Sequence, residues 1–176
     1  MRIAGVDPGT IHAGVGIIDG SGREPKLIFS GTIHTTGNKL ISVRLELIYT
    51  ELKTVFERWK PDVVALENVF YNKNFQSAVR VGEARAAAMI AARACAISVV
   101  EYAPARVKQA VCGNGRASKE QVQYMVRHIL NVRRPLDPDS ADALAVALCH
   151  LNTRGRGVLQ YAPTISAGRG IRSRVL

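Results

Sequence analysis

The sequence is short of acidic residues, of cysteine and of long apolar runs. It has 14 Asp and Glu against 24 Lys and Arg, which gives a formal charge of +10. A chain this basic is expected to bind a polyanion, most commonly nucleic acid, although a merely well-solvated surface can carry the same charge. Because acids are scarce, the position of each one is informative.

The three cysteines, at positions 95, 112 and 149, form no CxxC pair. An odd count without a secretion signal favours a reducing compartment over a disulfide framework. The N-terminal apolar run is too short for such a signal and ends at Asp7. The most apolar stretch, residues 86–96, is interrupted by Arg93 and is far below membrane-spanning length. We therefore expect a soluble, cytoplasmic protein.

The chain pattern predicts one α/β domain over residues 1–153. Apolar runs predict strands at 2–6, 13–19, 26–35, 62–66 and 96–102. Helical spacing and start signals predict helices at 40–59, 73–95, from 104 onward, 118–130 and 137–151. The fourth of these begins with a Ser118–Gln121 capping box, and the last begins with Asp137 as a capping acid before Pro138. Consecutive strands followed by alternating strands and helices indicate a mixed five-stranded sheet flanked by helices.

Residues 154–176 differ from the rest of the chain in composition. They carry five arginines, several glycines, no acid and no lysine. This composition predicts a basic, flexible C-terminal tail that holds half of the net charge.

Four acids occupy positions where chemistry is expected. Asp7 and Glu67 each end a predicted apolar strand, at the sheet edge where open α/β sheets bind ligands. Asp139 and Asp142 are three residues apart, so they share one face near the start of the last predicted helix. If that helix packs against the sheet edge, the four carboxylates converge. Two like charges 4 Å apart repel by about 4 kcal/mol at an effective dielectric near 20, so such a cluster needs protons or divalent cations.

An all-oxygen site suits Mg²⁺, with Mn²⁺ as a substitute, better than zinc. The histidines at 12, 34, 128 and 150 show no ligand spacing and are interpreted as structural or surface residues. Two ions bound by the acids would be suited to phosphodiester cleavage. Simpler interpretations stay open, because Asp7 can belong to an Asp-Pro-Gly turn and Asp139 can complement the helix dipole. Glu67 has no such ordinary role, since an acid closing a buried strand is costly without a partner.

Basic and aromatic residues accompany the acids in the sequence. Lys108 follows the helix start at Pro104, and Lys119 begins the capped helix. Between them, the glycine-rich loop 112–116 can bring Arg116 to a phosphate or serve as a plain connector. Phe70, close after Glu67, can stack on an unpaired base or belong to the core.

Four segments also carry a resemblance to a known family. They read Gly-Val-Asp-Pro-Gly-Thr at 5–10, Pro-Asp-Val-Val-Ala-Leu-Glu-Asn-Val-Phe at 61–70, Val-Lys-Gln at 107–109 and Ser-Ala-Asp-Ala-Leu-Ala at 140–145. In this order and spacing, residues 2–151 resemble the bacterial RuvC family of Holliday junction resolvases. The resemblance implies a ribonuclease-H-like fold and a homodimer that nicks a four-way DNA junction symmetrically during recombination and repair. It also implies a branch-migration complex of the RuvA and RuvB type as a partner.

The same resemblance implies roles for individual residues. The matching acids, which would bind two Mg²⁺ ions and be catalytic, are Asp7, Glu67, Asp139 and Asp142. Lys108 and Lys119 match lysines that contact DNA, Phe70 matches a base-stacking aromatic, and residues 82–92 match a dimer helix.

Three other classes of protein fit the sequence less well. A sugar kinase or actin-like ATPase shares Asp-x-Gly-Thr after a strand but needs two such domains. A related ribosomal-RNA-processing nuclease is generally shorter and is not expected to match the lysine and capped-helix segments. A non-catalytic junction-binding module would gain nothing from four acids.

Overall fold

The computed structural model describes residues 1–68, 75–153 and 160–161. Along the chain the elements are β1 (Arg2–Asp7), β2 (His12–Asp19), β3 (Lys26–His34), α1 (Ile41–Trp59), β4 (Val63–Glu67), α2 (Phe75–Ala94), β5 (Ser98–Tyr102), α3 (Pro104–Cys112), α4 (Lys119–Ile129), α5 (Pro138–Thr153) and β6 (Gln160–Tyr161). Every strand and helix predicted from the sequence is present, with bounds that differ by a few residues.

The strands form one mixed sheet in the order β3-β2-β1-β4-β5-β6. β1 pairs antiparallel with β2 and parallel with β4, and β4 pairs parallel with β5. The predicted mixed five-stranded sheet is therefore confirmed. The short β6 pairs antiparallel with β5 and adds a sixth strand at the edge, within the segment predicted as a tail. The rest of that segment, and Phe70, lie outside the described residues.

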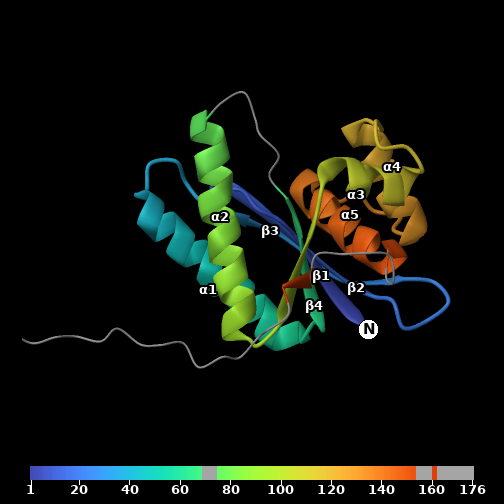
Figure 1. The fold of residues 1–176 in the computed structure, drawn as a ribbon, viewed down its shortest axis with the longest axis horizontal. Coiled ribbons are helices and arrows are strands. Elements are labelled where there is room, and N and C mark those ends of the chain that lie inside the picture. The colour runs from blue at the N-terminus through green and yellow to red at the C-terminus, as the bar shows by residue number, and fades with distance from the viewer. Residues whose placement is uncertain (69–74, 154–159, 162–176) are drawn as a thin grey trace, which may run out of the picture.

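Helices cover both faces of the sheet. α1 and α2 lie against one face, and α3, α4 and α5 lie against the other (Figure 1). Val6 in β1 and Leu66 in β4 both belong to the apolar core beneath α1 and α2. Successive side chains of a strand point to opposite faces, so the next residues, Asp7 and Glu67, point to the α5 side. The strand pattern therefore places two of the predicted acids on the face that carries the other two.

Glycines let α5 pack closely against the sheet. A Cβ added at Gly5 would collide with the carbonyl oxygen of Ala143, and one added at Gly14 would collide with the carbonyl oxygen of Asp139. Both partners are backbone atoms, which cannot turn aside as a flexible side chain can. The absence of a side chain at Gly14 thus sets how near the first turn of α5 lies to β2.

The start of α5 is also held by hydrogen bonds that the side chain of Asp137 accepts. Its Oδ1 accepts from the backbone N–H of Asp139 at 3.1 Å and from the Thr32 hydroxyl at 2.6 Å. The Thr32 bond is the main reason that the pKa of Asp137 lies below its usual value. Asp137 therefore has the capping role expected from the sequence, and it ties α5 to β3.

Within the part of the chain that the structure describes, no helix is long and apolar enough to cross a membrane.

Candidate active site

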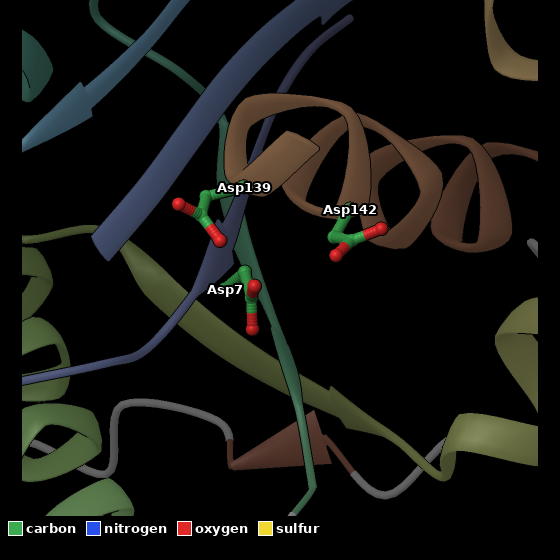
Figure 2. A group of neighbouring side chains, drawn as sticks. All are labelled: Asp7, Asp139 and Asp142. Carbon is green, nitrogen blue, oxygen red and sulfur yellow. The ribbon is translucent and has the colours of Figure 1, made fainter. Parts of the chain in front are cut away.

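Three carboxylates meet where the end of β1 faces the start of α5. Asp7, Asp139 and Asp142 each offer one oxygen, and these atoms all lie within 4.8 Å of one another. Figure 2 shows Asp139 and Asp142 on the first turns of the helix, with Asp7 beside them at the strand end. The structure thus brings together three of the four acids selected from the sequence. A compact set of hard oxygen ligands fits a divalent cation such as Mg²⁺ or Mn²⁺.

Asp7 has the most perturbed carboxyl of the cluster. Burial, followed by the negative charges of Asp142, Glu67 and Asp139, raises its pKa to about 7, and the charge of Lys119 opposes this shift. A carboxyl with this pKa is about half protonated at neutral pH. A cation placed among these oxygens would compensate for both burial and repulsion, so the electrostatics fit a metal site as well as the geometry does.

Glu67 lies at the margin of the cluster. It is not a member of the group of oxygens within 4.8 Å. Burial and then the charge of Asp142 raise its pKa, while Lys108 and Lys119 act in the opposite direction. Glu67 therefore belongs to the same electrostatic site, but its carboxylate does not lie within 4.8 Å of all three aspartates.

A cavity of about 230 Å³ joins Glu67 to the basic residues. Its charged lining residues are Glu67, Lys108, Lys119 and Asp142, and α3, α4 and α5 supply its apolar lining. Both lysines selected from the sequence thus open onto the space beside the carboxylates. An anionic group that entered this cavity would meet two cations next to the acid cluster.

Lys119 forms an ion pair with the cluster itself. Its Nζ lies 2.6 Å from Asp142 Oδ2. Burial raises the pKa of Asp142, and the hydrogen bond and charge of Lys119 counter that shift. The predicted capping box sets this geometry, because the Ser118 hydroxyl accepts from the Gln121 N–H and Ser118 N–H donates to Gln121 Oε1. Lys119 is therefore fixed as the first residue of α4.

Arg116 is exposed on the loop between α3 and α4. The Gln109 side chain braces that loop by donating to the Gly113 carbonyl at 2.8 Å and accepting from Gly115 N–H at 3.0 Å. Arg116 is not among the described residues that line the cavity beside the acids. The structure thus places Lys108 and Lys119 beside the carboxylates and leaves Arg116 farther out.

Two residues that support the site were not selected from the sequence. The carbonyl oxygen of Thr10, three residues after Asp7, accepts from Arg44 Nε at 2.9 Å and from the Thr35 hydroxyl at 2.5 Å. Arg44 and Thr35 are both buried. They hold the turn that follows Asp7, but Arg44 belongs to α1 and Thr35 follows the end of β3. No local sequence signal marks such long-range contacts.

The strand order, with acids at the ends of adjacent parallel strands and on the helix packed over them, places this chain in the ribonuclease-H-like class. The family model described as crossover junction endodeoxyribonuclease RuvC matches residues 3–150. The chain therefore belongs to the RuvC family, as the sequence motifs predicted.

Relatives and solved structures agree with this assignment. A crossover junction endodeoxyribonuclease RuvC of Geotalea uraniireducens is 44% identical over 153 residues, which cover 87% of this chain and 90% of the relative. One from Bordetella avium is 42% identical over 99% of this chain and 96% of its own, so the likeness extends into the C-terminal segment. The structure of T. thermophilus RuvC in complex with Holliday junction substrate superposes with a TM-score of 0.81 at 36% identity, covering 85% of this chain and 92% of that one.

Proposed function

We propose that this protein is a structure-selective endonuclease that resolves Holliday junctions by symmetric paired nicks during DNA recombination and repair. The observation that carries the proposal is the cluster of Asp7, Asp139 and Asp142 at one sheet edge in a chain of the RuvC family. The T. thermophilus relative, which is similar over most of both chains, is described in complex with a Holliday junction substrate.

The cofactor in this proposal is Mg²⁺, with two ions per subunit and Mn²⁺ as a substitute. Asp7, Glu67, Asp139 and Asp142 would hold the metal, since their oxygens are hard ligands and Lys119 compensates only part of the cluster's negative charge. Bound there, divalent cations would supply the Lewis acidity for hydrolysis, which activates a water and stabilises the leaving 3′ oxygen.

Basic and aromatic side chains of the protein would position the scissile phosphate for cleavage. Lys108 and Lys119 line the cavity beside Glu67 and Asp142, where they can pair with phosphate oxygens of the bound strand. Lys119 is more than half exposed, so its ammonium can turn from Asp142 toward a phosphate without breaking the core. We further assign Arg116 to backbone contacts and Phe70 to base stacking at the crossover.

A symmetric substrate suits a symmetric enzyme. One acid cluster per chain can cut one strand, so two opposed nicks call for a homodimer in which both clusters face the junction. The proposed partner is a branch-migration complex of the RuvA and RuvB type on the same DNA. We place the reaction in the cytoplasm, in keeping with three cysteines that are all free.

The decisive experiment incubates the protein with a synthetic mobile four-way junction in Mg²⁺, beside the Asp7→Asn variant. We expect paired symmetric nicks from the parent, and junction binding without cutting from Asp7→Asn, because the variant keeps the fold and loses one metal ligand. Linear duplex of the same sequence is the control substrate. Equal cutting of linear duplex, or an active Asp7→Asn variant, would contradict the proposal.

A further inference from the structure

Two histidines meet on the α5 face of the sheet, outside the cluster of three aspartates. His12 opens β2 and His34 closes β3, and the two are direct partners in the antiparallel ladder. Their Nδ1 atoms lie 2.9 Å apart and their rings meet edge to face. Both side chains are exposed. The sequence showed no ligand spacing between them because the pairing of β2 with β3 brings them together.

The distance between the two Nδ1 atoms matches the distance between two nitrogen atoms that bind the same metal ion. Two imidazole nitrogens that bind one ion at a right angle, as in square-planar sites for Ni²⁺ or Cu²⁺, are about 2.9 Å apart when each bond is about 2.0–2.1 Å long. In the cation-free protein, one Nδ1 must donate a hydrogen bond to the other. Replacing that shared proton by a cation requires each ring to turn until its lone pair points at an ion that lies off the line between the two nitrogens. The paired strands thus hold two nitrogen ligands at the spacing of a chelate, on side chains that are exposed and free to turn.

A carboxylate lies close to this pair. The Asp137 carboxylate accepts a hydrogen bond at 2.6 Å from the hydroxyl of Thr32. Thr32 lies two residues before His34 on the same face of β3. Asp137 therefore adds a negative charge beside the imidazoles, which favours a cation there.

We propose that His12 and His34 form a second metal site, a two-imidazole chelate for a late first-row divalent cation such as Ni²⁺ or Cu²⁺. Imidazole nitrogen prefers these ions, whereas Mg²⁺ prefers oxygen. The two sites are therefore chemically distinct, although both lie on the face that carries α5. A cation held by the histidines adds positive charge near the catalytic edge. The proposal does not depend on the nuclease function and can fail without it.

The test is calorimetric titration of the full-length protein with Ni²⁺ in excess Mg²⁺, which keeps the carboxylates occupied. We expect one Ni²⁺ per chain. His12→Ala and His34→Ala should each weaken binding by a factor on the order of a hundred, because one imidazole remains and the gain from a second tethered ligand is lost. The matched control is His128→Ala, an exposed histidine on α4 that stacks on Tyr124. It should bind Ni²⁺ as the parent does.

A second measurement reads the ligands directly. The spectrum of bound Cu²⁺ in electron paramagnetic resonance should report two coordinated nitrogens in the parent and in Asp7→Asn, and one in each variant of the histidine pair. Ni²⁺ binding that survives both His12→Ala and His34→Ala, or that disappears in Asp7→Asn, would overturn the proposal. So would a parent Cu²⁺ spectrum without nitrogen coordination.

Discussion

At the scale of single residues, Asp7 is the acid of the site whose ionised form is most strongly disfavoured. Its carboxyl is buried at a strand end, and three other acids raise its pKa further. In the metal-free protein this is a destabilising arrangement, because the folded chain holds a proton that the unfolded chain releases. The same arrangement favours the binding of a cation. A divalent ion bound to the folded protein neutralises the repulsion between the carboxylates and so raises the free energy of unfolding.

The pH dependence of stability follows from this shift. The pKa of Asp7 is about 7 in the folded protein and 3.8 in an unperturbed aspartate. The stability contributed by this group is fully present below pH about 4 and is lost as pH rises through about 7. In EDTA, Asp7→Asn should therefore raise the free energy of unfolding at pH 8 relative to the parent, by up to roughly 4 kcal/mol.

Thermal unfolding of both proteins in EDTA between pH 4 and pH 8 checks this prediction. The parent should lose stability with rising pH more steeply than Asp7→Asn does. Addition of Mg²⁺ at pH 8 should raise the melting temperature of the parent more than that of the variant, because the variant lacks a ligand. Parallel pH curves for the two proteins would show that Asp7 is not the group responsible.

At the scale of elements, the packing of α5 on β1 and β2 decides where Asp139 and Asp142 lie. The helix comes close because Gly5 and Gly14 present no side chain to its backbone. Asp137 then anchors its first turn to β3 through Thr32. The acid cluster is thus a property of one helix–sheet contact and would not survive displacement of that helix.

Gly14→Ala tests this dependence. Its new Cβ would meet the carbonyl oxygen of Asp139, so the start of α5 must move away from β2. We expect a loss of about 1–3 kcal/mol of stability from overpacking, and weaker Mg²⁺ binding because the aspartates separate. Gly22→Ala is the control, since the nearest atom to its Cβ is Glu24 O at 3.7 Å.

Denaturant unfolding and calorimetric Mg²⁺ titration give the two readouts for both glycine variants. Gly22→Ala should match the parent in both. A Gly14→Ala protein with the Mg²⁺ affinity of the parent would show that the position of α5 is not what assembles the carboxylates.

The elements themselves were predictable because their signals are local. Apolar alternation marks β1 to β5, and the Ser118–Gln121 capping box and Asp137 mark the starts of α4 and α5, as the structure confirms. The two-residue β6 was not predicted. It has no alternation to detect and is defined only by its pairing with β5.

At the scale of the whole molecule, positive charge is distributed unevenly. Half of the +10 charge belongs to the five arginines after residue 153, and Lys108 and Lys119 flank the acids. A basic segment in a chain that binds a polyanion adds affinity through counterion release, without reading sequence or structure.

We therefore predict that the C-terminal arginines add salt-sensitive affinity and do not select the cut positions. The test variant replaces Arg154, Arg156, Arg169, Arg172 and Arg174 by glutamine, which keeps the chain length and the strand β6. Junction binding should weaken, and its dependence on the logarithm of salt concentration should become shallower by about 0.9 for each phosphate that an arginine no longer neutralises. Nick positions, mapped on denaturing gels, should match those of the parent, and shifted nicks would contradict this assignment.

By itself, the sequence determined which residues can do chemistry and which elements carry them. The acids stand at strand ends and at a helix start, so their identity and their spacing along the chain follow from local patterns. The motifs also determined the family, and the family model and the relatives confirm it.

Only the tertiary structure decided which of these groups meet. It brought Asp7, Asp139 and Asp142 within 4.8 Å, left Glu67 at the margin and paired Lys119 with Asp142. It also joined His12 to His34 across two strands. These contacts link residues far apart in the sequence, and they depend on strand register and on how closely α5 approaches the sheet. Local periodicity carries neither quantity, because both arise when the packed layers bury their apolar faces together.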